Sequence, residues 1–172
     1  LINHNVWSIE TAPWALTVMA TGGVAILPLP PRGPHPEFIL PTSTIALWPY
    51  TNLSDQRWNF GKRYIMLRQD PKNSSPQKMG VFATDGWAAY ANKGNLFIKQ
   101  VPLQFDGVYP DLGVNFEIFT NDEMLEIESL GPLESIPPKG QINHMEHWTL
   151  IQDVPQPENE ADIVQQIVPH LE

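Results

Sequence analysis

Short apolar runs alternate along the chain with clusters of turn residues. Most runs are rich in β-branched and aromatic residues, and pairs such as Gly22-Gly23 and Lys93-Gly94 separate them. The segments at 28–36, with five prolines, and at 70–76 read as loops. The pattern predicts an all-β, antiparallel β-sandwich, with strands at 6–10, 14–19, 24–27, 44–47, 64–69, 78–83, 87–91, 96–101, 113–120, 124–129 and 144–151.

One helix is expected at the C-terminal end of the chain. Its apolar stripe recurs at helical spacing and consists of Ile163, Val164, Ile167, Val168 and Leu171. Acidic residues stand at its start, including Glu160 and Asp162, where they suit the helix dipole. The helix is therefore predicted to pack on one sheet or to cover a sheet edge.

Length and charge restrict the classes of partner. A chain of 172 residues suits one domain, and the N-terminal sequence, which lacks an initiator methionine, leads us to expect the C-terminal part of a longer protein. The net charge is −9 with only 10 Lys and Arg, so neither a nucleic acid nor an anionic membrane is an expected partner. No apolar run reaches the ~20 residues that cross a bilayer.

The segments 113–120 and 124–129 form the most informative local pattern. A two-residue turn at Asn121-Asp122 would place Glu117 opposite Glu126 and Asn115 opposite Glu128. The opposite face is apolar and is expected to point into the core; it consists of Phe116, Ile118, Leu125 and Ile127. Like charges that face each other in a sheet are destabilising, so we expect water, a cation or a shared proton to offset them. The pattern has two readings: a solvated outer face, or a sugar-binding surface on which one glutamate acts as a base.

Several motifs resemble those of the galactose mutarotase-like (aldose 1-epimerase-like) superfamily. The run Asn3–Ile9 resembles the mutarotase pattern Asn-His-x-Tyr-Phe-Asn-Leu. The strand around Glu126 and Glu128, followed by Pro137-Pro138-Lys139-Gly140, resembles the C-terminal layout of that family. An uncharacterised branch of the superfamily is more similar still, through the runs 12–16, 86–90, 109–111 and 130–133.

The resemblance implies acid–base chemistry on a hexose or a related sugar, without a cofactor or a metal. His4 would be the general acid and Glu128 the base, with Glu126 as the alternative base. The other expected sugar-binding residues are Asn115, Glu117, Lys78, Lys99 and Trp58. Lys78 and Lys99 would balance the acidic face of the hairpin, and a long side chain such as that of Lys99 is expected to reach solvent. In this sequence Ser129 and Leu130 replace the Thr-Gln that follows the family's base, and the family's second histidine and arginine have no counterpart.

The remaining expectations concern aromatic residues and other functions. Trp14, Trp87 and Trp148 lie in strand-like runs and are expected in the core, whereas the polar neighbours of Trp58 indicate exposure. A non-catalytic accessory domain that self-associates as a homodimer through a sheet edge is the alternative function. A cupin-like metal site built from His144, Glu146 and His147 is a third reading.

Overall fold

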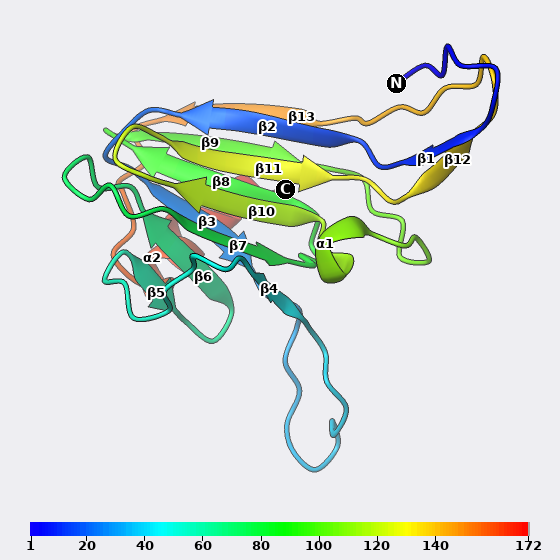
Figure 1. The fold of residues 1–172 in the computed structure, drawn as a ribbon. Helices are drawn as coiled ribbons and strands as arrows, with labels where there is room; N and C mark the ends of the chain where they lie inside the picture. The colour runs from blue at the N-terminus through cyan, green and yellow to red at the C-terminus, as the bar shows by residue number, and fades with distance from the viewer. Residues whose placement is uncertain (172) are drawn as a thin grey trace.

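The computed structural model describes residues 1–171 and consists mainly of two antiparallel sheets stacked face to face (Figure 1). The predicted all-β sandwich is therefore confirmed, and neither sheet closes into a barrel. The five-stranded sheet has the order β2-β11-β10-β7-β4: Trp14–Met19, Leu125–Leu130, Phe116–Thr120, Gln77–Val81 and Ile45–Leu47. The six-stranded sheet has the order β13-β9-β8-β3-β6-β5: His147–Gln152, Asn95–Gln100, Trp87–Asn92, Val24–Pro28, Tyr64–Arg68 and Trp58–Phe60.

The central strands of the six-stranded sheet are apolar on both faces. Successive strand residues point to opposite faces, so in β3 Ala25 and Leu27 pack against the five-stranded sheet while Val24 and Ile26 pack on the other side. Burial on both faces explains why β3 is a continuous apolar run and lacks the alternation of a half-exposed strand.

The C-terminal helix α2 (Glu160–Gln166) covers the outer face of the six-stranded sheet. Ile163 and Ile167 of the predicted stripe are buried against that face. Asn159 caps the helix in a capping box with Asp162, which fixes its start. The observed helix is shorter than the predicted apolar stripe, which continues to Leu171. Pro169 has no N–H to continue the helical hydrogen bonds, so the chain ends in a 3₁₀ turn, η1 (Val168–His170).

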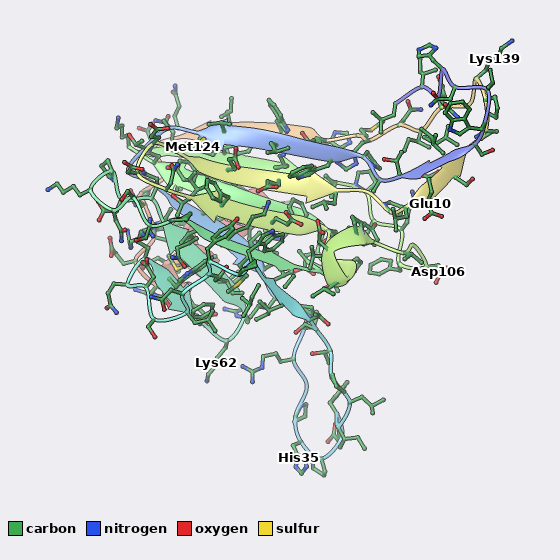
Figure 2. The ribbon with its side chains drawn as sticks, in the orientation of Figure 1. Glu10, His35, Lys62, Asp106, Met124 and Lys139 are labelled. Carbon is green, nitrogen blue, oxygen red and sulfur yellow. The ribbon has the colours of Figure 1, made fainter. Side chains whose placement is uncertain are left out.

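Two segments extend away from the sandwich (Figures 1 and 2). The ribbon of β1 (Ile9–Thr11) and β12 (Glu134–Ile136), together with the N-terminal segment that pairs with residues 139–142, forms an arm beyond one end of the sheets. The loop between β3 and β4 protrudes separately, with His35 at its tip. A short turn α1 (Pro110–Gly113), with Asp111 and Leu112 in the left-handed region, precedes β10.

Strand boundaries deviate from the sequence prediction mainly at the arm. The strands β5 and β12 were not expected, and the run at 6–10 contributes only the start of β1. The last strand begins at His147, three residues after the predicted start at His144. Within residues 1–171 no helix combines the length and the apolar character needed to cross a membrane.

Candidate functional site

The turn between β10 and β11 differs from the prediction and changes which glutamates face each other. It spans Asn121–Met124, where the Asn121 N–H donates to the Met124 carbonyl at 3.2 Å. The Asn121 side-chain oxygen also accepts from the N–H groups of Glu123 and Met124, which stabilises the longer turn. The prediction of a two-residue turn at Asn121-Asp122 is therefore wrong.

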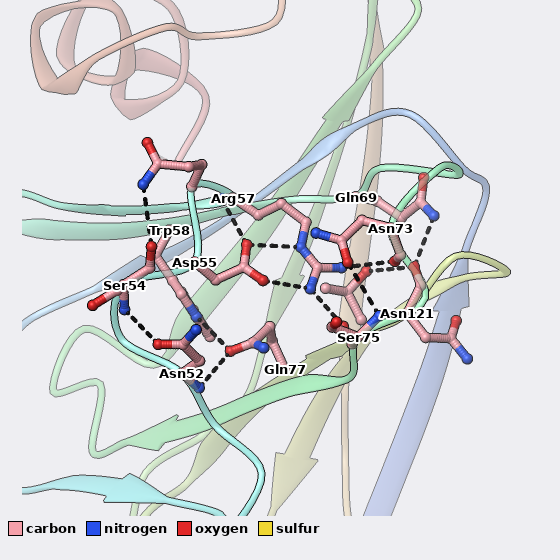
Figure 3. Close-up of polar contacts among 12 residues, drawn as sticks. Asn52, Ser54, Asp55, Arg57, Trp58, Gln69, Asn73, Ser75, Gln77 and Asn121 are labelled. Carbon is pink, nitrogen blue, oxygen red and sulfur yellow. Dashed lines mark hydrogen bonds and ion pairs between the residues drawn. The ribbon is translucent and has the colours of Figure 1, made fainter.

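A polar network next to this turn fixes it to the rest of the sandwich (Figure 3). The Gln69 amide donates to the carbonyl oxygens of Asn121 and Asp122 at 2.9 and 3.1 Å. The Gln69 side-chain oxygen accepts from the Gly22 N–H at 2.7 Å. These contacts hold the turn of the five-stranded sheet against the β2–β3 connection.

The register that results places Glu117 directly opposite Glu128, and Phe119 opposite Glu126. The predicted pairs Glu117–Glu126 and Asn115–Glu128 are therefore wrong, because the observed register differs from the predicted one by two residues. A shift of two residues keeps every side chain on its predicted face, because the strand period is two. The expected apolar face is accordingly confirmed: Phe116, Ile118, Leu125 and Ile127 all lie in the core between the sheets.

Lys78, on the neighbouring strand β7, lies between the two facing glutamates. Its Nζ atom is 2.8 Å from Glu117 Oε2 and 2.8 Å from Glu128 Oε2. Trp14 donates its indole N–H to the same Glu128 oxygen at 2.8 Å. The ring centroids of Trp14 and Trp48 are 5.2 and 4.8 Å from Nζ, within cation–π range. We call Lys78, Glu117, Glu128, Trp14 and Trp48 the Lys78 cluster.

The charged side chains of the Lys78 cluster are buried, and they include more carboxylates than cations. Glu117 and Glu128 are 1% and 0% exposed, and one lysine cannot neutralise two ionised carboxylates. Burial raises the pKa of Glu117 to about 7, and the nearby Glu128 charge adds to that effect against the opposing influence of Lys78. One carboxyl group of the pair is thus able to gain or lose a proton near neutrality.

The pKa values of Lys78 itself and of two residues near the cluster are also raised. Burial acts to lower the pKa of Lys78, but its ion pairs with Glu117 and Glu128 outweigh that effect and raise the pKa above the ordinary value. Burial, aided by the Glu128 charge, raises the pKa of Glu126. Burial raises the pKa of Tyr50 as well. Glu126 therefore lies within the electrostatic reach of the pair without contacting Lys78.

Lys99 belongs to a second cluster, formed on the inner side of the sandwich. The prediction that Lys99 balances the hairpin carboxylates is corrected here: its Nζ is 2.8 Å from Glu146 Oε1, and it also donates to the carbonyl oxygens of Ile127 and Ala15. Lys99 is completely buried because its position in β9 points between the sheets. Burial lowers the pKa of Lys99, although its bond with Glu146 opposes that shift.

Glu146 connects Lys99 to three further side chains. Glu146 Oε1 accepts from the Ser129 hydroxyl, and Oε2 accepts from the Trp148 indole N–H at 2.9 Å. The Ser129 oxygen lies 2.7 Å from His144 Nε2. Burial acts to raise the pKa of Glu146, but the bonds from Lys99 and Ser129 outweigh it and lower the pKa. We call Lys99, Glu146, Ser129, His144 and Trp148 the Lys99 cluster.

The hydrogen-bond directions in the Lys99 cluster exclude a serine-hydrolase arrangement. The Ser129 hydroxyl proton is donated to Glu146, so His144 Nε2 must act as the donor to the serine oxygen. A triad would need the opposite direction, with the histidine accepting the serine proton. Burial lowers the pKa of His144, which suits this neutral role. The cluster thus orients groups and does not activate a nucleophile.

A pocket of about 450 Å³ lies between β2 and β13, the edge strands that run side by side in Figure 1. Its lining includes Trp14 from the Lys78 cluster, His144, Glu146 and Trp148 from the Lys99 cluster, and Pro13. Trp14 and Trp148 are 56% and 59% exposed, so the expectation that both lie in the core is wrong. Only Trp87 of the three is buried there.

The other predicted site residues lie away from the Lys78 cluster. Asn115 directs its side chain to the backbone N–H and carbonyl of Ala83, which makes it a structural residue. Trp58 is not exposed as predicted, because it packs in the core and donates its indole N–H to Gln77. His4 is exposed in the arm, next to Asn3, whose backbone pairs with Lys139 and Gly140.

Comparisons with known proteins add no further constraint: the chain matches no protein-family model, no curated protein and no solved structure. Within residues 1–171, no group of three or more His, Asp or Glu side chains is placed to hold a metal ion. The prediction of a cupin-like metal site at His144, Glu146 and His147 therefore gains no geometric support. The site that the structure itself offers consists of the two lysine clusters and the pocket between them.

Proposed function

We propose that the protein binds a carbohydrate at the Lys78 cluster and transfers protons there, as an aldose 1-epimerase-like isomerase of a hexose or related sugar. One observation carries this proposal. Two buried glutamates face each other across a sheet, share one lysine at 2.8 Å and lie beside surface aromatic rings, and the pKa of one of them is near 7.

The composition of the cluster suits a sugar. Glu117 Oε1 and Glu128 Oε1 are buried and accept no hydrogen bond from residues 1–171, so they offer acceptors for ligand hydroxyl groups. Trp14 and Trp48 supply flat apolar surfaces for the C–H face of a sugar ring. Because the carboxylates are covered, a sugar would reach them only when a partly exposed neighbouring ring, that of Tyr50, moves aside.

The facing carboxyl groups suit the proton transfers of mutarotation. The ring oxygen and the anomeric hydroxyl are both attached to the anomeric carbon, so two side chains that lie next to each other can reach both. Glu128 then accepts the hydroxyl proton, and Glu117, partly protonated near pH 7, donates to the ring oxygen. Glu117 takes the acid role that the mutarotase-like resemblance implied for His4, which lies in the arm.

The test is the rate at which a freshly dissolved aldose equilibrates between its anomers, followed by polarimetry. We expect the protein to accelerate this rate and Glu128→Gln to reduce the acceleration by about 100-fold or more, the usual contribution of a general base. Glu123→Gln, at an exposed position in the same hairpin turn, is the matched control. Absence of acceleration across a panel of aldoses, or full activity in Glu128→Gln, would exclude the catalytic part.

A second candidate is a non-catalytic domain that pairs with another copy of itself. The observation in its favour is that the edge strands β2 and β13 carry exposed apolar side chains, including Leu16, Val18 and Leu150. This alternative predicts a dimer that dissociates on dilution in light scattering, together with no change of tryptophan fluorescence on addition of sugars.

A further inference from the structure

We infer that the pocket between β2 and β13 is a second sugar subsite, so that the ligand is an oligosaccharide of two or more linked rings. This inference rests on the proposed function, because it extends the sugar site at the Lys78 cluster. It assigns a role to the Lys99 cluster, which the proton-transfer chemistry does not use.

The pocket has the size and the walls of a ring-binding site. Its volume of about 450 Å³ falls within the range of roughly 300–1,000 Å³ that small-molecule sites occupy. Trp14 and Trp148, from the two edge strands, line it together with apolar Pro13 and Ala15. Two indoles and a few polar groups are the combination that binds the alternating C–H and hydroxyl surfaces of a sugar.

Both indole rings are held in place before any ligand binds. Trp14 donates its N–H to Glu128, which is paired with Lys78, and Trp148 donates its N–H to Glu146, which is paired with Lys99. Trp148 also packs edge-on against Phe97, with centroids 5.5 Å apart. Side chains that are fixed in advance lose little conformational entropy on binding, which favours affinity.

Trp14 connects the pocket to the Lys78 cluster. Lys78 lies over the Trp14 ring, yet 56% of the side chain remains exposed and lines the pocket. A sugar ring at the Lys78 cluster and a second ring in the pocket would therefore both contact this tryptophan. This geometry favours linked rings over two independent monosaccharides.

The polar side of the pocket offers a hydrogen-bonding group. His144 lines the pocket, and its Nε2 is occupied by Ser129. In the tautomer that donates from Nε2, Nδ1 is an acceptor, and it accepts no hydrogen bond from residues 1–171. Glu146, in contrast, already accepts from Lys99, Ser129 and Trp148. The second ring is thus expected to hydrogen-bond to His144.

The experiment compares a monosaccharide with its linked di- and trisaccharides by calorimetry, for the wild type, Trp148→Ala and the control Trp7→Ala. Trp7 is also exposed, at 61%, but does not line the pocket. We expect the oligosaccharides to bind the wild type more tightly than the monosaccharide, and Trp148→Ala to weaken only the oligosaccharides, by about 10-fold. Trp7→Ala should change neither affinity.

Other outcomes separate the two proposals. Equal weakening of monosaccharide and oligosaccharide in Trp148→Ala, or no weakening of either, would overturn the second subsite and leave the Lys78 site intact. If the wild type binds no sugar, the proposed function fails and the subsite fails with it. A wild-type dimer that Trp148→Ala dissociates, measured by sedimentation, would also overturn the inference, because the pocket would then be an interface. Thermal unfolding of each variant verifies that it is folded.

Discussion

The molecule contains two buried lysines whose surroundings differ in charge balance. Lys78 lies between two carboxylates, Glu117 and Glu128, whereas Lys99 has one carboxylate, Glu146, and two backbone carbonyl oxygens. The pKa of Lys78 is raised and that of Lys99 is lowered, because the carboxylates outweigh burial only around Lys78.

This difference separates a cluster that exchanges a proton near neutrality from one whose charges are balanced. The Lys78 cluster carries one carboxylate too many, so a proton can enter or leave it near neutrality through Glu117. In the Lys99 cluster one cation matches one anion, and every N–H of the ammonium group has an acceptor. Both clusters include a surface tryptophan, but only the Lys78 cluster has a carboxyl group that titrates near neutrality.

Removal of each lysine is expected to give the largest contrast between the clusters. Lys78→Met leaves two buried carboxylates facing each other, which should lower the free energy of unfolding by about 3–5 kcal/mol. Lys99→Met should cost only about 1–3 kcal/mol, because Glu146 reaches the pocket and can be hydrated. Urea unfolding at pH 7 measures both changes.

The exposed Lys72 provides the control for these variants. Lys72→Met should change the free energy of unfolding by less than about 0.5 kcal/mol, since the residue lies in a surface turn. A larger loss in Lys99→Met than in Lys78→Met would contradict the charge-balance account. It would mean that the ion pair of Lys99 contributes more to the free energy of unfolding than the ion pairs of Lys78.

The alternation of residues predicted the faces of the hairpin but not its register. A strand has a period of two, so Glu117 and Glu128 were correctly placed on the outer face and Phe116 and Ile127 in the core. The register depended on the length of the turn, which the Asn121 side chain and contacts from Gln69 determine. Contacts from a distant strand cannot be read from a local pattern.

The predictions for Lys99 and for the two exposed tryptophans failed for the same reason, because their burial depends on tertiary structure. Lys99 was expected to reach solvent, yet its strand is covered on both faces, and only the partner Glu146 from another segment allows that burial. Trp14 and Trp148 lie in regular strand patterns, and their exposure follows from β2 and β13 being edge strands. The order of strands in a sheet is a tertiary property.

The pH dependence of stability gives the next largest effect. The pKa of Glu117 is about 7 in the folded state, above its ordinary value of 4.5, so the native protein binds a proton that the unfolded chain releases. The stabilisation is full below about pH 4.5 and is lost as the pH rises through about 7. Relative to Glu117→Gln, the wild type should lose on the order of 3 kcal/mol between these limits.

Urea midpoints of wild type and Glu117→Gln, taken from pH 5 to pH 8, provide the measurement. Glu123→Gln, in the exposed turn, should follow the wild type at every pH. If the stability of the wild type relative to Glu117→Gln stays constant, or increases, as the pH rises, the Lys78 cluster holds no proton that is released near neutrality.

The smallest expected contrast lies in the two indole hydrogen bonds. Trp14→Phe removes a donor from Glu128, which is fully buried and cannot replace it with water, so a loss of about 1.5–3 kcal/mol is expected. Trp148→Phe removes a donor from Glu146 at a bond exposed to solvent, where water takes its place, so the loss should stay below about 1 kcal/mol. Thermal unfolding resolves the two, and equal losses would mean that water does not reach Glu146, so that the pocket is closed in solution.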